Sequence, residues 1–175
     1  MSLMAASVAV AQQQSSPNGN VVLTFSLTAE GTPAYKVTYK NKPVVKESTL
    51  GFSLKKAEPT TTVNEPLTKN FRVIGEQKST FKETWKPVWG EESEILNHYN
   101  ELLVSLMQEG TNRLMNIRFR VYDEGVGFRY EFPSQKELTY FVVEEELTQF
   151  AMAGDHTAWW IPGDYDTQEY DYMES

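Results

Sequence analysis

The stretch LMNIRFRVYDEGVGFRYEF (residues 114–132) decides the fold class, because its hydrophobic side chains recur at every second position. These alternating positions are Ile117, Phe119, Val121, Val126, Phe128, Tyr130 and Phe132. A period of two predicts two strands, each with one buried face. Asp123 to Gly125 separate the two arms, and glycine there favours a turn with left-handed backbone. We therefore predict an antiparallel hairpin whose other face carries Arg118, Arg120, Arg129 and Glu131.

The same alternation extends to other parts of the chain. VVLTFSL (21–27) and NHYNELLVSLM (97–107) alternate, and Lys40 to Lys42 read as a turn between two short strands. Residues 55–69 are rich in Pro, Thr and charge and are typical of a mobile loop. Residues 144–147 could be helical, but they are too few for a helix that stands alone. Many short strands predict an all-β fold, most simply an antiparallel β-sandwich.

The composition of the chain excludes several classes of function. The chain has 175 residues, enough for one domain with its own core, and a net charge of −8. Nucleic-acid partners are excluded, because their phosphates require a basic surface. The absence of cysteine excludes disulfides, thiolate metal sites and cysteine nucleophiles.

Residues 1–15 are interpreted as a cloning leader, the remnant of a signal peptide and a flexible start. Ala9-Val10-Ala11 before Gln12 fits a signal-peptidase site, whereas Met1 to Leu3 resembles a leader added in cloning. The alternative is an ordinary Ala-rich terminus. No stretch is long enough for a transmembrane helix. We expect an exported, periplasmic protein whose β-sandwich domain occupies residues 16–175.

Four tryptophans form two groups, Trp85 with Trp89 and Trp159 with Trp160. Exposed rings can stack on the apolar faces of sugars, which would make a carbohydrate-binding surface. The preferred interpretation is that the rings fill the sandwich core or a seam between domains. Because adjacent strand residues point to opposite faces, at most one of Trp159 and Trp160 should face a ligand.

The closing stretch, residues 154–175, contains six acidic residues and neither Lys nor Arg. Tested as an EF-hand from Asp164, it has Glu169 where glycine is required and Ser175 where glutamate is required. A self-sufficient calcium loop is therefore excluded, and one or two ligands of a site completed elsewhere, or simply a hydrated surface, remain.

No other motif predicts an active site. His98 and His156 belong to no metal-binding signature, and Glu91, Glu92 and Glu94 are typical of a solvated loop. The sequence also lacks a nucleophile elbow, a phosphate-binding loop and a dinucleotide fingerprint. We expect no catalytic residue in this chain.

Three long motifs resemble the amino-terminal domain of glycoside hydrolase family 97, in particular its α-glucosidases of bacterial starch utilisation. They are FKETWKPVWGEESEILNHYNEL (81–102), IRFRVYDEGVGFRYEFP (117–133) and GDHTAWWIPGDYDTQEYDY (154–172). The resemblance runs from Ser16 to the end. It implies a galactose-mutarotase-like super-sandwich that packs on a catalytic (β/α)₈ barrel of the same polypeptide. It also implies an exported enzyme that hydrolyses α-linked oligosaccharides, α-glucosides with inversion or α-galactosides with retention.

For the site, the resemblance implies Ca²⁺ held by several glutamates, and the ligand from the sandwich matches Glu169. Family domains generally run further, so we expect an incomplete sandwich that binds Ca²⁺ weakly and associates with itself. Two rivals to an accessory domain remain, a free-standing carbohydrate-binding module that uses Trp159 or Trp160, and a structural protein that binds no sugar.

Overall fold

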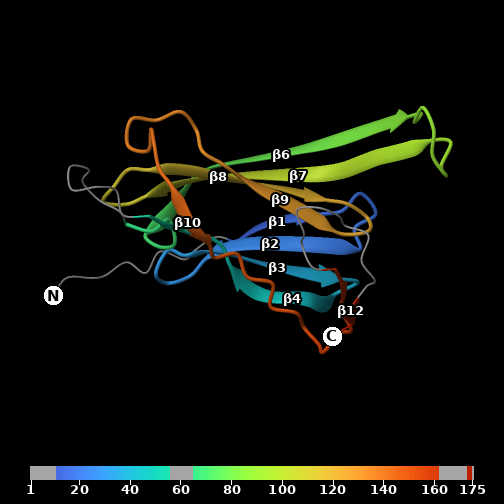
Figure 1. Cartoon of the computed structure of the whole chain (residues 1–175), viewed down its shortest axis with the longest axis horizontal. Coiled ribbons are helices and arrows are strands. Elements are labelled where there is room, and N and C mark those ends of the chain that lie inside the picture. Colours follow the sequence, from blue (N-terminus) through green and yellow to red (C-terminus); the bar gives the residue numbers. More distant parts are fainter. Residues whose placement is uncertain (1–10, 56–64, 162–172, 175) are drawn as a thin grey trace.

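The computed structural model describes residues 11–55, 65–161 and 173–174, and every regular element among them is a β-strand. No helix in this part of the chain is long and apolar enough to cross a membrane. Two antiparallel four-stranded sheets lie one above the other (Figure 1). The predicted all-β sandwich is therefore confirmed.

The first sheet has the order β1-β2-β3-β4. Its strands are β1 (Gln12–Ser15), β2 (Val21–Leu27), β3 (Pro33–Tyr39) and β4 (Lys42–Thr49). The predicted turn between β3 and β4 is confirmed, with Lys40 at φ 48° and Asn41 at φ 65°. Two successive left-handed residues match the right-handed twist of the flanking strands. The sequence analysis assigned the residues of β1 to the flexible start, since Gln-Gln-Gln-Ser shows no alternation of polar and apolar side chains. In the structure they pair with β2.

The second sheet has the order β6-β7-β8-β9. Its strands are β6 (Phe71–Trp85), β7 (Ile95–Gln108), β8 (Leu114–Val121) and β9 (Val126–Glu131). The predicted hairpin is β8–β9, in which Phe119 faces Phe128. The expected left-handed glycine is wrong, since Gly125 is not among the residues with positive φ. The turn is closed instead by Tyr122 N–H donating to the Gly125 carbonyl at 2.8 Å.

The core lies between the two sheets, where alternate residues of both point inward. Phe25 of β2 and Phe119 of β8 are completely buried, with ring centroids 6.0 Å apart. Other fully buried residues are Leu23, Leu102, Val104, Leu106, Met115, Ile117 and Val121. Burial of this apolar area is the main force that holds the sheets together.

Two two-stranded sheets complete the described strands. β5 (Phe52–Leu54) pairs with β10 (Val143–Glu146), and β11 (Trp159–Trp160) pairs with β12 (Met173–Glu174). The helix considered for residues 144–147 is wrong, because the hydrogen-bonding partner that β5 supplies makes most of this segment a strand. Of the predicted mobile loop, residues 56–64 lie outside the described residues, and its end packs on the sandwich. Leu67 is fully buried and exchanges backbone hydrogen bonds with Phe52, at 2.9 and 3.2 Å.

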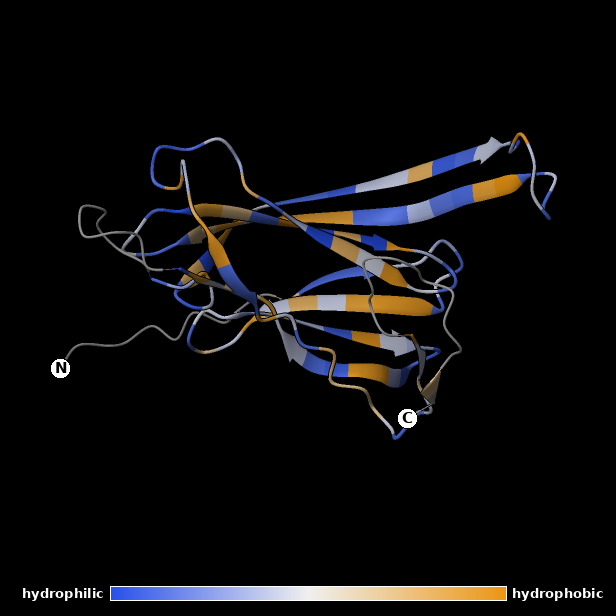
Figure 2. Cartoon of the chain, viewed as in Figure 1, coloured by the Kyte–Doolittle hydropathy of each residue, from blue (hydrophilic) through white to orange (hydrophobic). Residues whose placement is uncertain are grey.

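One part of the second sheet projects beyond the sandwich (Figure 1). The last pair between β7 and β8 is Asn100 with Val121, so residues 81–85 and 95–99 pair only with each other in the described structure. We call residues 81–99 the β6–β7 arm. Figure 2 shows hydrophobic residues at the outer end of β7, although no second sheet covers them there.

Candidate functional site

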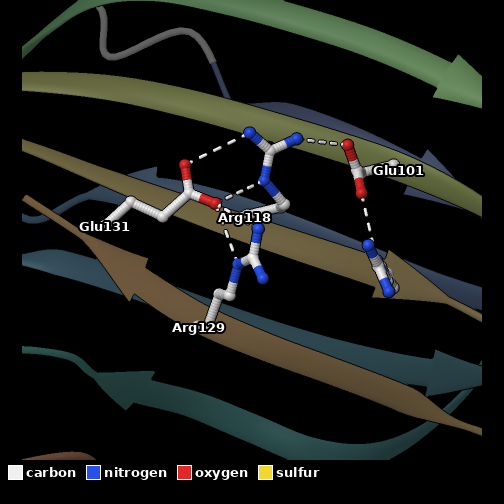
Figure 3. A network of polar contacts seen from close by, with 5 residues as sticks. Glu101, Arg118, Arg129 and Glu131 are labelled. Atoms are coloured by element: carbon white, nitrogen blue, oxygen red, sulfur yellow. Dashed lines mark hydrogen bonds and ion pairs between the residues drawn. The ribbon is translucent and has the colours of Figure 1, made fainter. Parts of the chain in front are cut away.

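Five charged side chains form a network on the outer face of β7, β8 and β9 (Figure 3). Alternation places them there, since Leu102, Phe119 and Tyr130 beside them point inward. The residues are Glu101 of β7, Arg118 and Arg120 of β8, and Arg129 and Glu131 of β9. The register pairs Glu101 with Arg120 and Arg118 with Arg129.

Arg118 lies at the centre of the network. Its guanidinium donates from Nε to Glu131 Oε1 at 2.6 Å and from Nη2 to Glu131 Oε2 at 3.1 Å, while Nη1 donates to Glu101. This bidentate geometry gives stronger hydrogen bonds than a single contact. Arg118 is only 23 % exposed and Glu101 11 %, so solvent screens their attraction less than at an open surface.

Two further arginines complete the network. Arg120 Nε donates to Glu101 Oε2 at 3.1 Å, and Arg129 Nε donates to Glu131 Oε1 at 2.9 Å. Hydrogen bonds that Glu131 accepts from Arg118 and then Arg129 lower the pKa of Glu131 despite partial burial. Donation to Glu131 raises the pKa of Arg118. Glu131 and Arg118 therefore stay ionised at neutral pH.

An aromatic cluster borders the network on the side of the arm. The Arg120 guanidinium lies 4.5 Å from the centre of the Tyr99 ring, a distance typical of a cation–π contact. Tyr99 stacks on Phe81 at 5.3 Å and contacts Tyr122 at 5.1 Å. These contacts orient Arg120 along the sheet.

The tryptophans are all at the surface. Trp89 is 89 % exposed, Trp159 65 %, and Trp85 and Trp160 46 % each. The preferred interpretation, that they fill the core of the sandwich, is therefore wrong, whereas a seam with another domain stays a prediction. Residues of β2, β3, β7 and β8 already fill the core. The tryptophan rings are therefore not needed to fill it.

Both Trp159 and Trp160 are substantially exposed, and that at most one of them faces a ligand stays a prediction. They belong to the two-stranded sheet β11–β12, where Trp159 pairs with Glu174 and Trp160 with Met173. Alternation hides a side chain only where a second layer covers one of the faces.

The predicted calcium ligand Glu169 lies outside the described residues, as does the segment tested as an EF-hand. Within residues 11–55, 65–161 and 173–174, no three His, Asp or Glu side chains gather as metal ligands. His98 lies in β7 opposite Lys82, and His156 is exposed. The acidic residues 91–94 are exposed, with Glu94 paired to Lys86 at 3.2 Å.

The sequence analysis placed four of the five network residues on one face but missed Glu101. Alternation in NHYNELLVSLM puts Glu101 opposite the face of Leu102, which is a usable signal. Its partners depend on the register between β7 and β8, which pairs Glu101 with Arg120, and alternation alone does not fix that register.

Comparison with known proteins shows which family shares this fold. The family model described as "Glycosyl-hydrolase 97 N-terminal" matches residues 15–175. A glycoside hydrolase family 97 enzyme from Pseudoalteromonas sp. strain K8, solved as a variant with panose and also with acarbose, is 32 % identical with a TM-score of 0.80. The match covers 94 % of this chain and 24 % of that enzyme.

A β-arabinopyranosidase shares the fold at 24 % identity, with a TM-score of 0.72 over 96 % of this chain and 26 % of that one. This chain thus spans about a quarter of the length of the solved enzymes it matches.

Proposed function

This chain belongs to the glycosyl-hydrolase 97 N-terminal family, and from that membership we propose that it is the non-catalytic amino-terminal sandwich of an exported glycoside hydrolase. The observation that carries the proposal is the family match over residues 15–175, which includes every described strand except the start of β1. Since the matched enzymes are about four times as long, the catalytic (β/α)₈ barrel is proposed to belong to the rest of the polypeptide.

The proposed substrate is an α-linked oligosaccharide. Panose and acarbose are the sugars bound by the matched enzyme from Pseudoalteromonas, which supports an α-glucoside before an α-galactoside. The sandwich would pack against the barrel and hold it in place. The exposed tryptophans of the β6–β7 arm support such a contact, because large apolar side chains are enriched in interfaces between domains.

Calcium is proposed as the cofactor of the complete enzyme, with Glu169 as the ligand from this chain. Ca²⁺ prefers six to eight oxygen ligands, and a carboxylate is a suitable donor. The described residues contain no complete set of metal ligands. One ligand is therefore proposed to come from this chain and the others from the barrel. When bound, the ion would supply positive charge to the active site.

The activity test compares this chain with the complete enzyme on p-nitrophenyl α-glucoside and α-galactoside. We expect the complete enzyme to release p-nitrophenol and this chain to remain at the level of a boiled control. Turnover by this chain that disappears when one of its acidic residues is replaced would overturn the assignment as a non-catalytic domain.

The calcium test uses the complete enzyme. Glu169→Gln removes one oxygen ligand and one negative charge, so it should weaken calcium affinity and lower activity, with partial rescue at high calcium. Asp171→Asn is the matched control and should do much less. Unchanged calcium titrations and turnover in Glu169→Gln would show that Glu169 is not a ligand.

A free-standing carbohydrate-binding module is the second candidate, favoured by the exposure of Trp159 and Trp160. Isothermal titration of this chain with maltooligosaccharides distinguishes the two. Saturable heat that is lost in Trp159→Ala or Trp160→Ala would favour the module, and the absence of heat would favour the accessory domain.

A further inference from the structure

A small cleft opens on the outer face of the second sheet, beside the charged network. Its lining consists of Arg118, Arg120, Tyr122, Gly127, Phe128 and Arg129. Gly127 makes the cleft possible, because a Cβ atom built there meets no atom within 4 Å. Arg120 lies directly opposite Gly127 and Arg118 opposite Arg129, and all three arginines line the cleft together with Gly127.

The positive charges at this cleft exceed the negative ones. Three arginines share two carboxylates, Glu101 and Glu131. Arg118 donates to both of them. Arg129 contacts only Oε1 of Glu131, through Nε and Nη2 at 2.9 and 2.8 Å, and it is 64 % exposed.

Arg120 also has N–H groups that can donate hydrogen bonds to a ligand. It bonds one carboxylate oxygen through Nε, interacts with Tyr122, and is 40 % exposed. Its stacking on Tyr99 holds the guanidinium plane beside the cleft. Arg120 and Arg129 therefore present preorganised donors on two sides of the open space above Gly127.

We propose that this cleft binds a carboxylate group. The planar guanidinium fork matches the two oxygens of a carboxylate, and the unbalanced positive charge favours an anion. The carboxylate could belong to an acidic side chain of a docked protein segment or to a free sugar acid, and both present the same group. Because Arg129 is exposed, a small carboxylate alone binds weakly, with a dissociation constant on the order of millimolar.

The test is an NMR titration of this 175-residue chain, labelled with ¹⁵N, at constant ionic strength. Sodium acetate replaces sodium chloride while the Nε–Hε signals of Arg120 and Arg129 are followed. Acetate should shift both signals in a saturable way. Gly127→Val, which fills the open space, and Arg129→Gln should each weaken binding at least about fivefold, because each removes part of the recognition of one carboxylate.

Arg72→Gln is the matched control, since Arg72 is another half-exposed arginine of this sheet, paired with Glu109 at 3.8 Å, and should leave the titration unchanged. An equal response to chloride and acetate, or wild-type affinity in folded Gly127→Val and in Arg129→Gln, would overturn the proposal. Glucuronate serves as the second arm. If it binds at least about fivefold more tightly than acetate, the ligand is a sugar acid, whereas equal affinity assigns the site to a protein carboxylate. The proposal does not depend on the proposed enzyme function.

Discussion

Strand β7 passes through two environments that bury its hydrophobic residues to different extents. Over the sandwich, Leu102, Val104 and Leu106 are completely buried between β6, β8 and the first sheet. In the β6–β7 arm, Ile95 is 37 % and Leu96 57 % exposed, since β8 ends at Val121 and no described strand takes its place. A two-stranded ribbon has little independent stability. Pairing with β6 therefore makes β7 a strand in both places, whereas burial of its hydrophobic residues stabilises it mainly where the first sheet covers one face.

The largest effect should come from replacing the same residue type in each environment. Phe119→Ala removes a fully buried ring that contacts Phe25, and it should lower the free energy of unfolding by about 3–5 kcal/mol. Phe81→Ala in the arm removes a ring that is 39 % exposed and should cost about 1 kcal/mol. Urea denaturation followed by circular dichroism measures both. Equal losses would show that the arm is as well packed as the core.

A smaller effect is expected from charge neutralisation. Glu101→Gln leaves Arg120 without a carboxylate partner and Arg118 with Glu131 alone, which should cost about 2 kcal/mol. Glu94→Gln in the arm breaks an ion pair with Lys86 in which both side chains are more than half exposed, so the cost should stay below about 0.5 kcal/mol. The same denaturation experiment applies. A loss in Glu101→Gln no larger than in Glu94→Gln would mean that the network adds nothing to stability.

The network should also make stability depend on pH. The pKa of Glu131 is lowered in the folded state by Arg118 and Arg129, so its contribution is present above the ordinary carboxyl pKa of 4.5. It is lost as the pH falls through the lowered value, because the unfolded state then takes up the proton more readily. Glu131→Gln should remove this part of the acid dependence, measured as the melting temperature between neutral pH and pH 3. A parallel profile in wild type and Glu131→Gln would contradict it.

The smallest effect on stability is expected at the tip of the arm. Trp89→Ala removes a ring that is 89 % exposed and should change the free energy of unfolding by less than about 0.5 kcal/mol.

Self-association of this chain is a separate prediction, because unpaired strand edges and exposed rings can bind another copy of the chain. Analytical ultracentrifugation of this chain should show self-association that increases with concentration, and Trp89→Ala should reduce it. A wild-type chain that stays monomeric over a wide concentration range would exclude it.

The sequence could reveal part of the candidate site but not its connections. Arg118, Arg120, Arg129 and Glu131 were found together because alternation within one hairpin fixes which residues share a face. Glu101 comes from a different strand, and only the register of β7 on β8 places it between two arginines. The cleft above Gly127 was not predictable either, since a glycine in a strand has the same sequence signal whether a neighbour fills the space or leaves it open.

The sequence by itself determined the local elements: the β8–β9 hairpin, the turn at Lys40 and Asn41, and the alternation that makes β2 and β7 strands. These follow from side-chain periodicity and from the backbone preferences of turn residues, which act over a few positions. Only the tertiary structure decided that β1 and β10 are strands, that the tryptophans are exposed and that one end of β7 lacks cover. The physical reason is that hydrogen-bonding partners and burial are supplied by residues distant in the chain, so the same local pattern can end in a core or in solvent.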